Sequence, residues 1–218
     1  MSRIDRAGVL LNVIKNFRKF LQDLPPSDSG ALLSDTEKRF LLEAARSSVV
    51  SAVRKTPPPY CESLEPSLLR RCGAFVTLRE GNELRGCIGY IDPIKPLGIT
   101  VCEVAAKAAL EDTRFPPVTP GELEGINIEI SVISPLTKMK DIAEIEVGKH
   151  GLLIEYKRSR GLLLPQVPVE FGWDRGTFLA QTARKAGLPP LIWNNPEAET
   201  YFFTAEIFDE KSEIHERI

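Results

Sequence analysis

Histidine is scarce in this 218-residue chain, which contains only His150 and His215. The scarcity limits metal sites and general-base catalysis, because imidazole is the commonest metal ligand and the commonest base near neutral pH. His215 lies in a charged stretch at residues 211–218, which we predict to be a solvated polar tail. His150 lies in a turn at residues 148–151 and is therefore the candidate catalytic base. A polar turn residue is the alternative interpretation.

Cysteine is also limited, to Cys61, Cys72, Cys87 and Cys102, and no two of them form a CxxC pair. Structural zinc sites usually draw on such closely spaced pairs, so we expect no metal site. The sequence indicates no cofactor either. In a reducing compartment the four cysteines are expected to be free thiols, most of them buried.

Long apolar runs and an excess of one charge are both absent. No segment approaches the roughly 18 apolar residues of a membrane span, and no small-residue cleavage site follows an apolar stretch near the N-terminus. We therefore expect a cytoplasmic protein without a membrane span. Lys and Arg total 28 against 30 Asp and Glu. Nucleic acid is consequently not a favoured partner, because nucleic-acid-binding domains are usually basic.

Several common catalytic motifs are missing as well. The chain has no P-loop, no dinucleotide-binding fingerprint, no HExxH and no Gly-x-Ser-x-Gly. Their absence argues against the commonest NTPases, dehydrogenases, zinc proteases and serine hydrolases.

The first 30 residues are predicted to form an amphipathic helix and a linker. Apolar residues recur at helical spacing from Leu10 to Leu21, and prolines and polar residues follow. Such a helix packs on its own domain, on a second subunit or on a membrane surface. A second helix is predicted from Ser34, because Ser34 and Glu37 have the spacing of a capping box. Three prolines at residues 57–59 end it.

Two later stretches share one order of predicted elements. Each has a strand hairpin, then a helix, then a strand: residues 74–91, 97–111 and 126–133 in the first, and 151–164, 174–186 and 201–208 in the second. Arg85-Gly86 and Arg160-Gly161 occupy equivalent places in the two hairpins. This pattern predicts an α+β fold with two pseudo-symmetric hairpin–helix–strand repeats within one domain, residues 31–210. A chance match of spacing is the alternative.

The segment Leu84-Arg-Gly-Cys-Ile-Gly89 is the main candidate site. Strand alternation would place Arg85, Cys87 and Gly89 on one face. A guanidinium beside a thiol favours the thiolate, so Cys87 is a candidate nucleophile or redox thiol. Gly86 and Gly89 mark a bulge or a close approach by another group, and a bound ligand is one such group. The alternative is that Cys87 only packs, as buried cysteines often do.

Residues 165–174 are predicted to be a loop before a helix, with Asp174 as the helix N-cap. Gln166, Glu170 and Trp173 in this loop are candidate ligand-binding residues. Arg114, two residues after Asp112, either braces a loop with that carboxylate or lines the site.

Taken together, these motifs resemble the AMMECR domain family. The matching segments are residues 73–78, 84–89, 112–118, 128–135, 148–152, 164–167 and 173–188. The resemblance spans residues 33–208, and the helix before Pro25 lies outside it. It implies two pseudo-symmetric α+β repeats with an additional N-terminal portion. It also implies a site between the repeats, where Arg85, Cys87, His150 and Gln166 converge.

The resemblance implies no established activity and no cofactor. Related domains occur beside, or fused to, Memo-like and radical-SAM proteins, which indicates a shared modification pathway, and roles in RNA-related processes have been suggested. Two hypotheses follow. One is an enzyme or enzyme component with a cleft site around Arg85 and Cys87, acting on a small molecule or a protein. The other is a non-catalytic binding module for a protein partner, a small anion or RNA. A homodimer is compatible with both.

Overall fold

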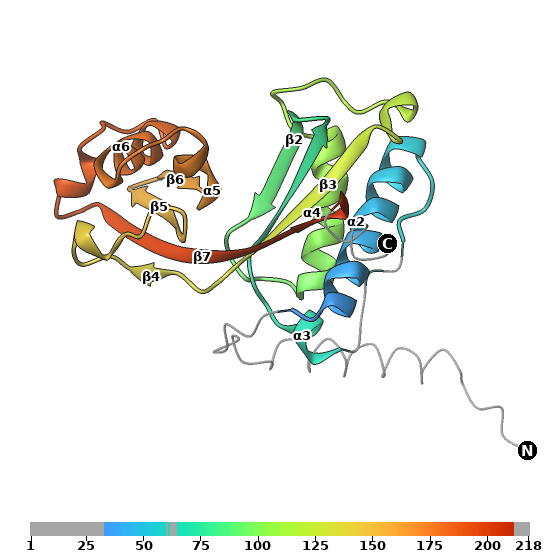
Figure 1. Cartoon of the computed structure of the whole chain (residues 1–218), viewed down its shortest axis with the longest axis horizontal. Helices are drawn as coiled ribbons and strands as arrows, with labels where there is room; N and C mark the ends of the chain where they lie inside the picture. Colours follow the sequence, from blue (N-terminus) through green and yellow to red (C-terminus); the bar gives the residue numbers. More distant parts are fainter. Residues whose placement is uncertain (1–32, 60, 62–64, 212–218) are drawn as a thin grey trace, which may run out of the picture. The chain divides into compact units, whose positions relative to one another are not determined.

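The computed structural model describes residues 33–59, 61 and 65–211 (Figure 1). The chain divides into two compact units, Met1–Ile128 and Glu129–Ile218, called here the first and second unit. The boundary falls inside strand β3 (Ile126–Ile133). The N-terminal helix and linker predicted for residues 1–30 lie outside the described residues, as does the predicted tail beyond residue 211.

The first unit is built on a strand hairpin. Strands β1 (Ala74–Glu80) and β2 (Glu83–Tyr90) pair antiparallel, and the strand order is β2-β1-β3. Gly81 in the hairpin turn has a φ of 61°, a left-handed conformation that glycine adopts without a steric cost. Ala74, Val76 and Leu78 alternate along β1 and are fully buried. The predicted hairpin is confirmed.

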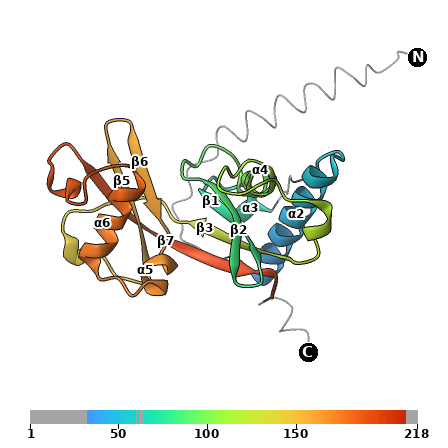
Figure 2. The ribbon, with the colours of Figure 1, turned by 90° about the horizontal axis from the view of Figure 1, so that it is seen from above.

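Two long helices cover this sheet in successive layers. Helix α4 (Leu97–Leu110) packs on β1 and β2, and helix α2 (Asp35–Arg54) packs on α4, as Figures 1 and 2 show. The predicted capping box is present, since the Ser34 N–H donates to Glu37 Oε2 at 2.7 Å. The short helix α3 (Pro66–Leu69) lies between α2 and α4 in the sequence, and the 3₁₀ turn η1 (Pro120–Glu122) follows α4.

The second unit has the strands β4 (Thr137–Lys138), β5 (His150–Tyr156), β6 (Ser159–Leu163) and β7 (Glu199–Asp209). Strand β5 lies between β6 and β7, and β7 also pairs with β4 and with the second half of β3. Helix α6 (Arg175–Lys185) packs on β5 and β6, and its core contact Phe178 is fully buried. Two 3₁₀ turns, η2 (Ile142–Glu144) and η3 (Ile192–Asn194), complete the unit.

Both predicted ends of α6 are confirmed. Asp174 is the N-cap and accepts the Thr177 N–H at 2.7 Å. Gly187, with a φ of 71°, follows the helix in the left-handed conformation that commonly ends one. The preceding segment differs from the prediction, because residues 166–170 form the short helix α5 (Gln166–Glu170) where a loop was expected. Pro168 lies in its first turn, where a missing N–H costs no hydrogen bond.

The order of hairpin, helix and strand can be compared between the two units. The strand order β2-β1-β3 of the first unit corresponds to β6-β5-β7 of the second, and α4 and α6 follow their hairpins in the same way. A sheet with antiparallel strand pairs, packed with helices, confirms the predicted α+β class. The predicted internal duplication agrees with this order but is not tested by it, and it stays a prediction.

The cysteine prediction is wrong for two of the four residues. Cys61 and Cys102 form a disulfide, with their Cα atoms 6.4 Å apart, and Cys72 and Cys87 are free. The partners are separated by 41 residues, so only the folding of the chain brings Cys61 within bonding range of Cys102 on α4. Within the described residues, no helix is both long enough and apolar enough to cross a membrane.

Candidate functional site around Cys87

A β-bulge in the first hairpin sets the geometry of the Leu84–Gly89 segment. Leu78 pairs with Gly86 and Arg79 pairs with Leu84, so Arg85 is an extra residue on β2 without a partner on β1. The simple alternation that placed Arg85 beside Cys87 therefore fails at Arg85. Beyond the bulge the register is regular, and Cys87 lies opposite Thr77.

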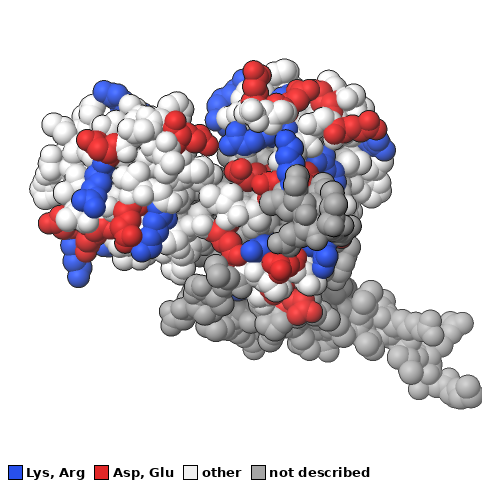
Figure 3. Space-filling model, viewed as in Figure 1, with Lys and Arg blue, Asp and Glu red and all other residues white. Residues whose placement is uncertain are grey.

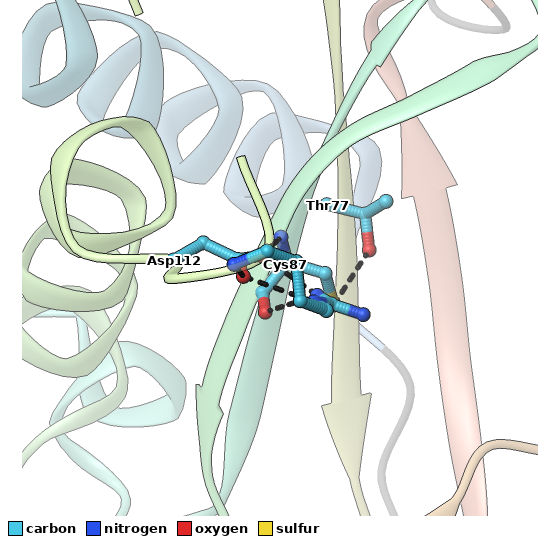
Figure 4. A network of polar contacts seen from close by, with 4 residues as sticks. Thr77, Cys87 and Asp112 are labelled. Atoms are coloured by element: carbon cyan, nitrogen blue, oxygen red, sulfur yellow. Dashed lines mark hydrogen bonds and ion pairs between the residues drawn. The ribbon is translucent and has the colours of Figure 1, made fainter. Parts of the chain in front are cut away.

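A polar network fixes the backbone of Cys87 (Figure 4). The Cys87 N–H donates to Asp112 Oδ2 at 2.8 Å, and the Cys87 carbonyl accepts from Arg114 Nη2 at 3.1 Å. Arg114 also grips the same carboxylate, with Nε 2.9 Å from Oδ1 and Nη2 2.7 Å from Oδ2. This bidentate ion pair orients the guanidinium more tightly than a single contact would.

The electrostatics follow from these contacts. Asp112 is 7% exposed, and its hydrogen bonds from Arg114 and from the Cys87 N–H hold its pKa at about 2, well below the usual value. The pKa of Arg114 is raised, first by Asp112 and further by the Cys87 sulfur. The cation bonded to the backbone of Cys87 is Arg114, whose side chain is 53% exposed.

The thiol itself is partly accessible. Cys87 is half-buried, and its Sγ accepts a hydrogen bond from the Thr77 hydroxyl at 3.4 Å. In Figure 4, Thr77 approaches the sulfur from the neighbouring strand and Asp112 approaches the backbone from the loop after α4.

Arg85 has another partner. Its Nε donates to Glu122 Oε1 at 2.6 Å, and this pairing, with the Thr119 N–H, holds the pKa of Glu122 at about 2. The Arg85 side chain is only 12% exposed. Arg85 therefore links β2 to η1, and its predicted contact with a ligand is not tested.

The two glycines of the segment lie against protein atoms. A Cβ at Gly86 would meet the Ala108 carbonyl oxygen of α4, and a Cβ at Gly89 would meet the Phe75 ring. Gly161 shows the same feature in the second unit, where a Cβ would lie 2.7 Å from the Thr182 carbonyl oxygen of α6. Close packing of a helix on the hairpin thus explains Gly86. Ligand binding by Gly86 and Gly89 stays a prediction.

His150 begins β5 and is 6% exposed. Its Nδ1 accepts the Glu146 N–H at 3.1 Å, and its ring stacks on Phe202 with centroids 4.6 Å apart. A nitrogen lone pair that accepts a backbone N–H is not available to take a proton from a substrate. These contacts give His150 a structural role at the start of β5, where a turn residue was the alternative interpretation, and its predicted role as a base stays untested.

The other candidates of the second unit lie on or beside α5. Gln166 begins the helix, and its buried Oε1 has no hydrogen-bond partner among the described residues. Glu170 ends the helix and is exposed. Trp173 stacks on Phe171 with ring centroids 5.0 Å apart and packs against the core of the unit. The predicted convergence of Gln166 and His150 with the residues of β2 is not tested.

Two classes of ligand, metal ions and nucleic acids, receive little support from the described residues. They contain no group of three or more His, Cys, Asp or Glu able to hold a metal ion. On the face in Figure 3, Lys and Arg side chains are interspersed with Asp and Glu rather than gathered in one basic region. The network around Cys87 instead offers a thiol and a fixed guanidinium, a combination suited to a small anionic group.

Sequence reasoning missed two contributors, Thr77 and Glu122. Thr77 faces Cys87 only because of the bulge, which shifts the pairing by one residue. Glu122 has the clearer signal, because Thr119 and Glu122 have the spacing of a capping box and so mark a fixed turn. Arg114 and Asp112 were identified as a pair that either braces a loop or lines the site, but their hydrogen bonds to the backbone of Cys87 were not predicted.

Comparison with known proteins shows the family. The AMMECR1 family model matches residues 42–208, which include the whole network. The chain belongs to the AMMECR1 family. Among its relatives, a protein of Thermococcus gammatolerans is 44% identical over 192 residues, covering 82% of this chain and 93% of the relative. A protein of Thermococcus kodakarensis is 45% identical with the same coverage.

A solved structure of an AMMECR1 relative supports the fold. The crystal structure of an uncharacterized protein from Pyrococcus horikoshii matches with a TM-score of 0.75 and 40% identity, covering 78% of this chain and 90% of that one. The family resemblance found in the sequence is confirmed.

Proposed function

We propose that this AMMECR1 protein is an enzyme, or a component of one, in which Cys87 is the reactive thiol. Arg114 binds an anionic group of the substrate and presents the reacting atom to the sulfur. The observation that carries the proposal is that Asp112 Oδ2 accepts hydrogen bonds from both residues, at 2.8 Å from the Cys87 backbone nitrogen and 2.7 Å from Arg114 Nη2. A cation held in place beforehand stabilises developing charge without a reorganisation cost.

Three features suit covalent chemistry at this sulfur. Cys87 is half-buried rather than buried, as a residue that meets a substrate must be. Thr77 donates to the sulfur and Arg114 donates to the carbonyl of the same residue, so a hydrogen-bond donor and a positive charge both lie at Cys87. The bonds from Arg114 to Asp112 use Nε and Nη2, and among the described residues no hydrogen bond donated by Nη1 is seen. Nη1 is the nitrogen we assign to the substrate anion.

A trapping experiment tests the proposal. The full-length protein is incubated with cell extract, quenched in acid, and its peptides are mapped by mass spectrometry for covalent adducts. We expect an adduct on Cys87 that is absent from Cys87→Ala and at least tenfold less abundant in Arg114→Gln. The Arg85→Gln variant is the matched control and should keep most of the adduct, because Arg85 pairs with Glu122.

One result of the trapping experiment would reject the proposal. If Cys87 reacts with a simple alkylating reagent but never carries an adduct from extract, the nucleophile role is rejected. The mass of the adduct would identify the reaction class. It would also test the predicted place in a modification pathway with Memo-like and radical-SAM proteins.

A second candidate function, a protein-binding module, is favoured by one feature of the second unit. Val169 and Phe171 are 60% and 64% exposed, and Phe171 stacks on Trp173. Large apolar side chains gathered on a surface often mark a protein-binding site. Glu170 and Asp174 flank them, so a partner with basic residues around an apolar contact would fit.

The double variant Val169→Ser/Phe171→Ser tests this module. We expect it to lose a partner that the wild-type chain captures, whereas Leu191→Ser, which changes an equally exposed residue of the same unit, should retain it. If sedimentation instead shows that only the wild type self-associates, the partner is a second copy of the chain. Equal capture by all three proteins would reject the module.

A further inference from the structure

A pocket of about 400 Å³ lies in the first unit, separate from the Cys87 site. Three elements form its walls: α2, α4 and the segment that follows α2. The volume is within the range of pockets that bind small molecules, roughly 300–1,000 Å³. Nothing in the proposed function uses it.

Small side chains at helical spacing create the space. Ser48, Ser51 and Ala52 line it from α2, and Ile99, Cys102 and Ala106 line it from α4. Positions three and four apart face the same way on a helix, so each helix presents one continuous wall. Because most of these side chains are short, the two helices pack without filling the volume between them.

The third wall is held by the disulfide. Pro58, Pro59 and Cys61 line the pocket, and the bond from Cys61 to Cys102 fastens this wall to α4. The contact is close, since a Cβ added to Gly98 on α4 would lie 2.8 Å from the Cys61 carbonyl oxygen. The hydroxyl oxygen of Ser48 lies 3.8 Å from the Cys61 sulfur.

The polar groups at the pocket select against a charged ligand. Glu103 is the charged residue of the lining, and it already accepts hydrogen bonds from Lys95 and from the Tyr90 hydroxyl. The bond from Lys95 lowers the pKa of Glu103, so the carboxylate is ionised and paired at neutral pH. A neutral molecule with a hydrocarbon or aromatic body would bury its surface against the remaining walls without an unpaired charge.

We propose that this pocket is a binding site for a neutral, mainly apolar small molecule, and that the Cys61–Cys102 disulfide controls its affinity. A dithiol reductant opens the bond by thiol–disulfide exchange. Two electrons and two protons pass from the dithiol to the cysteine sulfurs, leaving two thiols, while the reductant becomes a disulfide. The wall at Pro58 and Pro59 then loses its covalent link to α4, and the bound molecule loses one side of its site.

The test uses the full-length oxidised protein and N-phenyl-1-naphthylamine, a neutral fluorescent aromatic probe. We expect saturable binding of one probe per chain. Ser51→Leu, which fills the pocket and leaves the disulfide intact, should weaken binding at least tenfold. Ser47→Leu is the matched control, because Ser47 is exposed on the same helix and does not line the pocket; it should bind as the wild type does.

The redox arm treats the same proteins with dithiothreitol. Affinity of the wild type should fall at least tenfold, and the Cys61→Ala/Cys102→Ala variant should bind weakly with or without the reductant. Far-UV circular dichroism checks that reduced and oxidised chains keep the same secondary structure. Absence of saturable binding, undiminished binding by Ser51→Leu, or an affinity unchanged by reduction would each overturn the proposal.

Discussion

The carboxylate of Asp112 accepts the backbone N–H of Cys87 at 2.8 Å, across 25 residues of chain. The same carboxylate holds the guanidinium of Arg114. One buried acid therefore fixes the strand that carries the thiol and the cation next to it. The candidate site therefore consists of Cys87, Asp112 and Arg114, and not of Cys87 with Arg85, its neighbour in the sequence.

Replacing Asp112 should destabilise the protein. Asp112→Asn keeps the size of the side chain but removes the charge that Arg114 and the Cys87 N–H contact. Charge-assisted hydrogen bonds of a buried carboxylate contribute on the order of 2 kcal/mol. We expect the free energy of unfolding at pH 7, measured in urea, to fall by about this amount. A variant as stable as the wild type would show that the network is not an important contributor.

The pH dependence of stability should show the contribution of the ionised Asp112 carboxylate. The folded pKa of Asp112, about 2, lies below the roughly 3.9 of an unfolded aspartate. A depressed pKa stabilises the fold above the unfolded value, and this contribution is lost as the pH falls through the folded one. The difference in unfolding free energy between the wild type and Asp112→Asn should therefore shrink between about pH 4 and about pH 2. A constant difference over that window would contradict the assigned pKa.

The two free cysteines should differ in reactivity. Cys72 is buried, and desolvation raises the pKa of its thiol, whereas Cys87 is half-buried next to Arg114. Iodoacetamide at pH 8 should alkylate Cys87 in the native protein and leave Cys72 unmodified until urea is added. Peptide mapping distinguishes the two. Preferential modification of Cys72 would reverse the assigned accessibilities.

The glycines that contact helices should not tolerate a methyl group. Gly86→Ala and Gly161→Ala place a Cβ against the backbone of α4 and α6, and overpacking of this kind costs roughly 1–3 kcal/mol. Gly121→Ala is the control, because a Cβ there meets nothing within 4 Å. Urea unfolding should show a loss for the first two and almost none for the third. Equal stability of all three would remove the packing explanation.

Much of the fold follows from local sequence patterns. The capping box at Ser34, the alternation of Ala74, Val76 and Leu78, and the turn at Gly81 each depend on neighbouring residues, and each is confirmed. Helix α5 escaped prediction because two prolines and a glycine are typical of a loop. The first turn of a helix nevertheless accepts a proline such as Pro168.

The site depends on long-range geometry, which local patterns do not contain. A two-residue turn with regular pairing would place Cys87 opposite Val76, but the bulge at Arg85 moves it opposite Thr77. Arg114 reaches Cys87 from a loop 27 residues later, after the full length of α4. The disulfide is likewise set by packing, since Cys61 meets α4 only in the folded chain.

The most direct test of the central claim measures how Arg114 directs anions to Cys87. Rates of Cys87 alkylation are compared for iodoacetate, which is anionic, and iodoacetamide, which is neutral and similar in size. The ratio of the two rates cancels the intrinsic reactivity of the thiol. We predict that Arg114→Gln lowers this ratio at least fivefold while Arg85→Gln leaves it within twofold. A ratio unchanged by Arg114→Gln, or lowered instead by Arg85→Gln, would contradict the account.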